Sequence, residues 1–127
     1  MTGFDLETTF LGLDGKGGVA ELPVGPDFWQ TLGDNPKAFD TLVGIHPVTR
    51  DWPNWEVHPN GAEVLVLLDG RMDLIVDEGG AERRVEMRPG TTFVVPAGVW
   101  HTAKVLEPGR LLGMTFGAGT QHRQVQP

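Results

Sequence analysis

Residues 55–70 read WEVHPNGAEVLVLLDG, and this stretch decides the fold. It places Glu56, His58 and Glu63 within an otherwise apolar, strand-forming sequence. In an extended strand, positions 56 and 58 point to the same face with their Cα atoms about 6.5–7 Å apart. Both side chains can therefore reach one cation. Glu63 begins the next expected strand after a tight loop, so it can return beside them.

A second stretch, residues 90–101, reads GTTFVVPAGVWH. The β-branched run 91–95 is typical of a strand, and Pro96-Ala97-Gly98 predicts a turn. His101 then opens another strand, far in sequence from the first stretch. If these strands share a barrel, the side chains of Glu56, His58, Glu63 and His101 converge.

The rest of the chain is divided into similar short segments by 18 glycines and 10 prolines. Asp69-Gly70 predicts a tight hairpin, and Pro108-Gly109 predicts another turn. No long helical pattern separates the segments, which indicates a sandwich or barrel. Strands are expected at residues 42–48, 55–58, 63–68, 72–77, 83–88, 91–95, 100–106 and 111–116.

The first forty residues are less regular. Residues 14–18 form a glycine-rich loop, and residues 26–32 predict a short helix with Phe28, Trp29 and Leu32 on its apolar side. The sequence contains no repeat or break in composition. We therefore expect one domain, 1–127, with a core barrel at about 40–118.

Composition excludes several classes of function. The chain has 127 residues and no cysteine, so a metal would need nitrogen and oxygen ligands. A net charge of −7 argues against a nucleic-acid partner. No apolar run is long enough to span a membrane, and residues 1–10 do not look like a secretory signal. The expected location is the cytoplasm.

The two stretches together resemble the cupin superfamily, whose motifs are G-x5-H-x-H-x3,4-E-x6-G and G-x5-P-x-G-x2-H-x3-N. His58, Glu63 and Gly70 match the first motif in spacing, and the second is matched by Gly90, Pro96, Gly98 and His101. The resemblance implies an all-β, double-stranded β-helix (jelly-roll) barrel with a short N-terminal extension.

Three positions depart from the motifs: Glu56 replaces the first histidine, Arg50 the leading glycine and Val105 the last asparagine. The resemblance implies that Glu56, His58, Glu63 and His101 bind a divalent metal, either iron, manganese, zinc or nickel. Glu56 can instead be the general base. The alternative is a barrel without metal, in which Glu56 pairs with Arg50 or Arg71 and both histidines are interior hydrogen-bonding groups.

Further residues are weaker candidates. His46 and Trp100 are predicted to contact substrate, although a structural role is open for each. His122 and Arg123 either fold over the mouth of the barrel, toward an anionic ligand, or belong to a frayed tail.

The resemblance implies a small-molecule metalloenzyme, a dioxygenase or an isomerase/lyase acting on an oxygenated metabolite. The alternatives are a non-catalytic ligand-binding or sensor barrel, with or without a structural metal, and a structural subunit of an assembly. A small-molecule ligand and a homodimer are the expected partners, the homodimer because cupins commonly pair through sheet edges.

Overall fold

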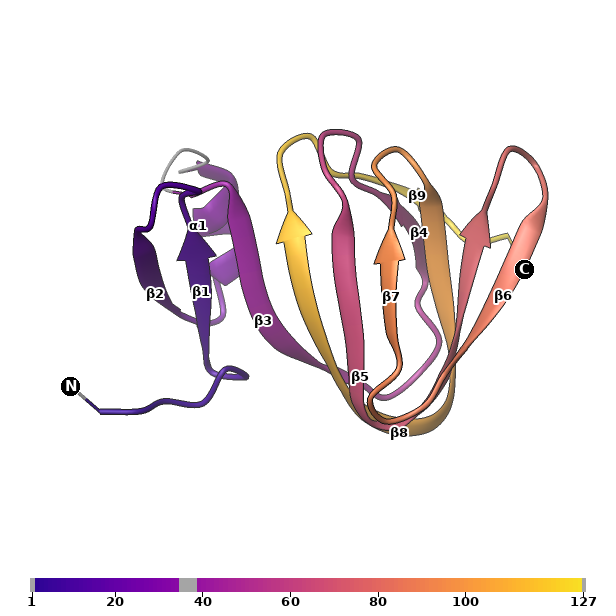
Figure 1. Ribbon diagram of the computed structural model, residues 1–127, viewed down its shortest axis with the longest axis horizontal. Coiled ribbons are helices and arrows are strands. Elements are labelled where there is room, and N and C mark those ends of the chain that lie inside the picture. The colour runs from indigo at the N-terminus through magenta and orange to yellow at the C-terminus, as the bar shows by residue number, and fades with distance from the viewer. Residues whose placement is uncertain (1, 35–38, 127) are drawn as a thin grey trace.

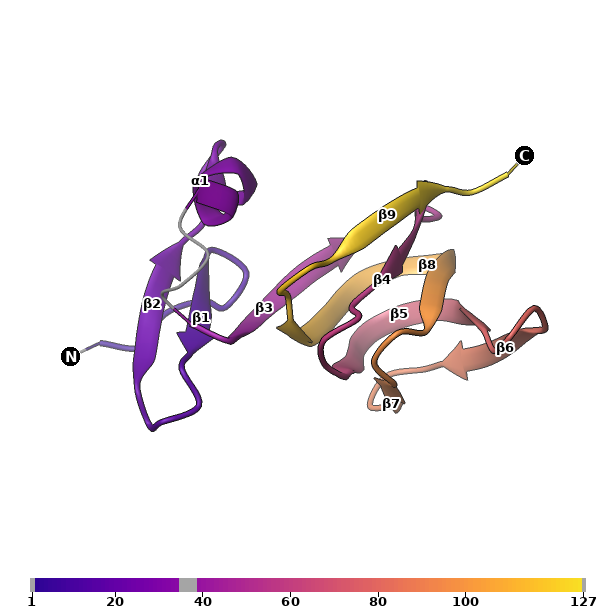
Figure 2. The same ribbon diagram turned by 90° about the horizontal axis from the view of Figure 1, so that it is seen from above.

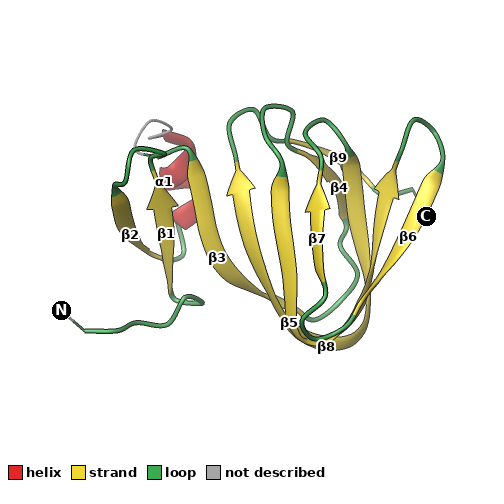
Figure 3. Cartoon of the chain, in the orientation of Figure 1, coloured by secondary structure: helices red, strands yellow, loops and turns green. Residues whose placement is uncertain are grey.

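The structure is a computed structural model that describes residues 2–34 and 39–126 (Figure 1). Antiparallel strands make up most of it, which confirms the all-β prediction (Figure 3). The elements in chain order are β1 (Thr9–Leu13), β2 (Val19–Pro23), α1 (Phe28–Asp34), β3 (Thr41–Val48), β4 (Asn54–Val57), β5 (Glu63–Asp77), β6 (Glu82–Met87), β7 (Thr92–Val95), β8 (Trp100–Phe116) and β9 (Gln121–Gln124).

Two long strands, β5 and β8, run through the whole barrel and pair with each other from Glu63↔Thr115 to Asp77↔Trp100. The first part of β5 also pairs with β7, and the last part of β8 pairs with β3. The last part of β5 pairs with β6, and the first part of β8 pairs with β4. The sheet therefore folds over on itself into two facing layers, and Figure 1 shows the bend of both strands at the bottom of the barrel.

The bend lies where the sequence predicted two turns, and that prediction was wrong. Asp69-Gly70 lies inside β5 and Pro108-Gly109 inside β8, so neither pair reverses the chain. Gly70 has φ +84°, and a Cβ there would lie 2.7 Å from the Glu107 carbonyl oxygen. A Cβ on Gly109 would collide with the Asp69 carbonyl group. Two glycines in contact allow both backbones to bend together, with register shifts at this point of the ladder.

The core fills the space between the two layers. It consists of inward-facing side chains of β5 and β8 with neighbours from β3, β6 and β7. On the last part of β5, Met72, Leu74 and Val76 face the core, and the residues between them, Asp73 and Ile75, are buried on the other face. The largest fully buried members are Leu67, Met72, Leu74, Val76, Met87 and Val95.

The N-terminal segment contains a hairpin that the sequence analysis missed. β1 pairs with β2 across the predicted glycine-rich loop and with β3 on its other side, so it extends one layer of the barrel. The Asp14 carboxylate closes the loop by accepting hydrogen bonds from the amides of Lys16 and Gly18. The predicted helix is confirmed as α1, and its Phe28 packs edge-on against Phe10 of β1. Figure 2 shows this unit beside the barrel.

The C-terminal residues form β9, which pairs with β4 from Asn54↔Gln124 to Val57↔Gln121. The Arg123 guanidinium lies over the rings of Trp55 and Trp100, at 5.3 and 4.6 Å from their centroids. The tail is therefore an ordered strand and not frayed, while contact of His122 and Arg123 with an anionic ligand stays a prediction. Within the described residues, no helix has the length and apolar character needed to cross a membrane.

The paired glycines at the bend give a test of the fold. We expect Gly70→Ala to lower the free energy of unfolding by more than about 2 kcal/mol, because it adds steric contact to an unfavourable backbone conformation. Gly79→Ala is the matched control: Gly79 has φ +73°, but nothing lies within 4 Å of an added Cβ. Urea denaturation of both variants measures the difference, and equal losses would contradict the close approach of the two strands.

Candidate metal centre

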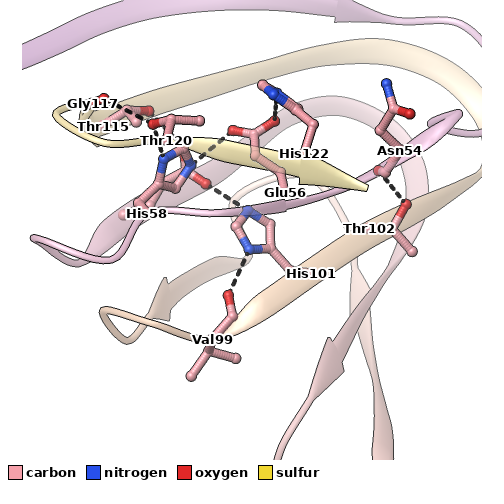
Figure 4. Close-up of polar contacts among 11 residues, drawn as sticks. Asn54, Glu56, His58, Val99, His101, Thr102, Thr115, Gly117, Thr120 and His122 are labelled. Carbon is pink, nitrogen blue, oxygen red and sulfur yellow. Dashed lines mark hydrogen bonds and ion pairs between the residues drawn. The ribbon is translucent and has the colours of Figure 1, made fainter. Parts of the chain in front are cut away.

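Four ionisable side chains meet at the open end of the barrel, and each is placed by strand register. Glu56 of β4 lies opposite His101 of β8, and Glu63 is the first residue of β5. His58 follows β4, where its carbonyl accepts a hydrogen bond from the Gly98 amide of the predicted turn. One ligand atom from each of the four side chains lies within 4.8 Å of all the others. The structure thus brings together the four residues predicted as ligands, and Figure 4 labels three of them, Glu56, His58 and His101.

The cluster is compact and mostly buried. His58 Nε2 lies 2.8 Å from Glu56 Oε1 and 3.2 Å from Glu63 Oε2, and His101 Nε2 lies 3.0 Å from Glu63 Oε1. His58, Glu63 and His101 are 3%, 5% and 0% exposed, whereas the Glu56 side chain retains 28% of its exposure. Burying three ionisable groups away from water costs free energy, so contacts within the cluster must offset this cost.

Hydrogen bonds on the far side of each imidazole determine which nitrogen faces the cluster. The Thr120 hydroxyl donates to the Gly117 carbonyl at 2.9 Å, so it accepts from His58 Nδ1–H at 2.8 Å. His101 Nδ1–H donates to the Val99 carbonyl at 3.1 Å. Both neutral rings therefore present the Nε2 lone pair to the carboxylates. Backing hydrogen bonds of this kind orient histidines that bind metals.

A lone pair facing a carboxylate is repulsive unless a cation or a proton lies between them. Burial lowers the pKa of His58, but the contacts with Glu56 and Glu63 outweigh it and raise that pKa to about 9. Burial raises the pKa of Glu63, yet the contacts with His101 and His58 dominate and lower it to about 2. Despite these close carboxylates, His58 Nε2 has no hydrogen-bond partner of suitable geometry. An orphaned, buried nitrogen among carboxylates fits a metal ion.

The donor set defines the kind of ion that fits. Two imidazole nitrogens and up to two carboxylates suit borderline or hard divalent ions such as iron, manganese, zinc or nickel, and no sulfur ligand is present. His58, His101 and Glu63 alone form the two-histidine, one-carboxylate set of open iron(II) sites. With Glu56 as a ligand, the site carries no net charge around a divalent ion.

A cavity of about 870 Å³ opens onto the cluster. Glu56, His58 and Glu63 line one part of it, and His46 lies in its wall, where a substrate contact of His46 stays a prediction. The cavity-lining residues in the described part of the chain do not include Trp100, whose ring lies against Arg123 instead. This arrangement gives an incoming small molecule a direct path to the candidate metal position.

Glu56 has histidine partners in this structure. Besides His58, it lies 3.6 Å from His122 Nε2, because Glu56 and His122 are paired across β4 and β9. Arg71, one of the two partners proposed for Glu56 in a metal-free barrel, pairs with Glu107 at 3.8 Å. The ion pairs among the described residues therefore favour a Glu56 that belongs to the cluster.

Two hydroxyl groups in the site were missed by sequence reasoning. Thr120 orients His58, and Thr115 donates a hydrogen bond to Glu63 Oε2 at 2.5 Å. Thr115 lies opposite Glu63 in the β5–β8 ladder, so register alone identifies it once the strand pairing is known. Thr120 lies in the loop before β9, and no local sequence signal connects it with His58.

The folded-over antiparallel sheet, with two histidines and two carboxylates at its open end, defines a small β-barrel with a candidate metal centre. The model of the cupin domain family matches residues 42–115, more than half of the chain, and the chain belongs to the cupin family. None of the curated proteins matches it.

Solved structures with the same fold include metalloenzymes. A cupin-2 domain protein from Shewanella frigidimarina NCIMB 400 is similar with TM-score 0.52 and 18% identity, over 60% of this chain and 70% of that one. Oxalate oxidase in complex with the substrate analogue glycolate is similar with TM-score 0.56 and 16% identity, over 71% of this chain and 50% of that one. Fe(II)-HppE with an alternative substrate is similar with TM-score 0.52 and 17% identity, over 61% of this chain and 43% of that one. The chain spans about half the length of these two enzymes, and the likeness shows the fold.

The backing hydrogen bond of His58 predicts the effect of a change outside the ligand set. Thr120→Val should weaken zinc binding by about 10- to 100-fold, because it leaves His58 Nδ1–H without an acceptor and frees the ring to turn. Thr120→Ser keeps the hydroxyl and should bind zinc like the wild type. Competition titration with a chromophoric chelator measures both affinities, and equal affinities for Val and wild type would refute the orienting role.

The pKa shifts predict how the metal-free protein responds to pH. The folded-state pKa of His58, about 9, exceeds its ordinary value of 6.5, so its stabilising contribution is complete below pH 6.5 and is lost as pH rises through 9. We expect the free energy of unfolding, measured by urea denaturation with chelator present, to fall over this range. His58→Gln should remove that fall. The exposed His122→Gln is the control, and a wild-type stability that stays level from pH 6.5 to 9 would contradict the ion-pair assignment.

Proposed function

We propose that this protein is a metal-dependent enzyme of the cupin kind, a dioxygenase or an isomerase/lyase that acts on an oxygenated small molecule. The observation that supports this most strongly is the opening of the four-residue cluster onto the 870 Å³ cavity. A structural ion needs four protein ligands and no path to solvent, whereas a catalytic ion needs free positions that a substrate can reach. His58, Glu63 and His101 would hold the metal.

The bound ion would supply Lewis acidity and positions for oxygen donors. The chain supplies the rest. Thr115 holds Glu63, Thr120 holds His58 and the Val99 carbonyl holds His101, so hydrogen bonds outside the cluster already orient the ligand atoms. Inward-facing apolar residues such as Leu65 and Leu111 exclude water from the base of the cavity.

Glu56 is the residue best placed to move a proton. It is the least buried member of the cluster, it lines the cavity, and His122 stands behind it at 3.6 Å. In this role its carboxylate accepts a proton from a substrate at the centre, and His122 balances the change in charge.

The alternative is a non-catalytic binding cupin, and the 2.8 Å contact between Glu56 and His58 Nε2 favours it in one respect. It places Glu56 where a fourth protein ligand would stand.

Metal content after purification without chelator tests the proposal, measured by plasma mass spectrometry. We expect about one equivalent of divalent metal in the wild type and its loss in Glu63→Gln and His101→Ala. The matched control is Asp73→Asn, which alters a buried carboxylate that pairs with Arg84 away from the cluster. Metal retained in both ligand variants, or lost in the control, would overturn the site.

Glu56→Gln separates the two roles of this carboxylate. If Glu56 is the general base, the Glu56→Gln variant should retain the metal. Its turnover in oxygenase, isomerase and lyase screens should fall about 10²- to 10⁴-fold. The iron(II) protein should also bind nitric oxide, which reports free positions on the ion by electron paramagnetic resonance. Loss of metal from Glu56→Gln, together with a wild-type site that binds no nitric oxide, would support the binding protein instead.

A further inference from the structure

The part of the cavity away from the metal cluster has an aromatic wall built by two elements. The rings of Trp29 from α1 and His46 from β3 are nearly parallel, with an interplanar angle of 23° and centroids 6.3 Å apart. Phe10 of β1 supports both rings edge-on, at 5.0 Å from His46 and 6.2 Å from Trp29. Both Trp29 and His46 line the cavity. The packing of Phe10 against both rings therefore holds this aromatic wall in place at the border of the cavity.

Trp29 is more exposed than a structural role requires. It keeps 59% of its surface accessible, whereas Phe10, which performs the packing, is 3% exposed. Burial raises the cost of charging His46 and lowers its pKa, so this ring is a neutral surface near neutral pH. An exposed indole beside a neutral imidazole, both facing a cavity, is suited to stack on a flat apolar molecule.

Gly113 keeps the space open between the wall and the metal cluster. It belongs to β8 and lies two residues before Thr115, the hydroxyl partner of Glu63. A Cβ at Gly113 would lie 3.7 Å from His46 Cδ2 and Nε2, and 3.7 Å from Leu65 Cδ2. These are ordinary contact distances, so an alanine fits the fold but narrows the cavity beside His46.

The charges that face the cavity limit the substrates it accepts. Its ionisable residues in the described part of the chain are the carboxylates Asp40, Glu56 and Glu63 and the histidines His46, His58 and His122. No lysine or arginine is among these lining residues. The two carboxylates of the cluster, Glu56 and Glu63, would already balance the charge of a divalent ion, and the whole chain carries a net charge of −7. A substrate with several negative charges would meet no compensating cation in this site.

We propose that the substrate is a flat, largely apolar molecule, uncharged away from its head, with oxygen donors at that head. The oxygens occupy the metal end of the cavity, and the body passes Gly113 to stack on Trp29 and His46. A volume of about 870 Å³ holds a body of two or more rings and is far larger than a two-carbon diacid needs. This inference rests on the proposed function, because the oxygens need the metal.

Three chelating probes of increasing size test it on the zinc-loaded protein, with binding measured by isothermal titration calorimetry. These are oxalate, catechol and 2,3-dihydroxynaphthalene, which carry no ring, one ring and two fused rings. We expect affinity to rise in that order. Trp29→Ala should weaken the naphthalene probe by about 5- to 10-fold, the value of one aromatic contact, and leave oxalate unchanged within about 2-fold.

Two further variants complete the design. Gly113→Ala should weaken the naphthalene probe more than catechol while zinc content stays at the wild-type value. Phe4→Ala removes another exposed aromatic side chain, 48% accessible and outside the cavity lining, and should change no probe. Circular dichroism and zinc content confirm that each variant is folded and loaded before titration.

The outcomes separate the failures. If zinc does not load, or no probe binds the loaded protein, the proposed metal function falls and takes this inference with it. Probes that bind with affinities unchanged by Trp29→Ala and Gly113→Ala would overturn the aromatic wall alone. Oxalate as the tightest probe would overturn the charge argument. A change in sedimentation coefficient for Trp29→Ala would instead identify Trp29 as a contact between copies of the chain.

Discussion

The structure depends on the buried Glu63 carboxylate, which needs a cation or a proton between it and the imidazoles beside it. Glu63 is 5% exposed and is held by His58, His101 and Thr115. An ionised carboxylate in that position is stable only if all three partners are in place, and they come from the loop after β4 and from both ends of β8. The cluster therefore fixes the relative position of the two layers at the open end of the barrel.

The other end of the barrel is fixed by backbone geometry. There Gly70 and Gly109 allow β5 and β8 to bend in contact, and each strand continues from one layer into the other. Because the same two strands carry Glu63 and His101, the bend sets how the layers face each other and so where these side chains meet. The apolar core thus lies between the glycine contact at the bend and the charged cluster at the open end. The cavity lies on the side where the layers open.

The sequence was sufficient to predict the barrel and the four clustered side chains, because motif spacing encodes which residues face the same interior. Local turn signals were misleading at Asp69-Gly70 and Pro108-Gly109. The pairing of β5 with β8 on both sides of the bend overrides the turn propensity of these residues. Gly70 and Gly109 each allow the opposite strand to approach closely. The strands β1, β2 and β9 are short and gain their order from tertiary pairing. Thr120 was not predictable, since only the folded chain brings its hydroxyl to His58.

The glutamate at position 56 connects the charge of the centre with the shape of the cavity. A histidine there would leave a divalent ion with one carboxylate and a net positive charge, which attracts anionic ligands. With a metal bound, Glu56 would remove that charge, and Asp40 adds a further acidic group to the lining. A centre without net charge gains little from binding an anion and must obtain affinity from contact area. The aromatic surfaces of Trp29 and His46 provide such area on the same cavity. If the proposed function holds, the glutamate and the aromatic wall would therefore be two parts of one preference for a neutral, flat ligand.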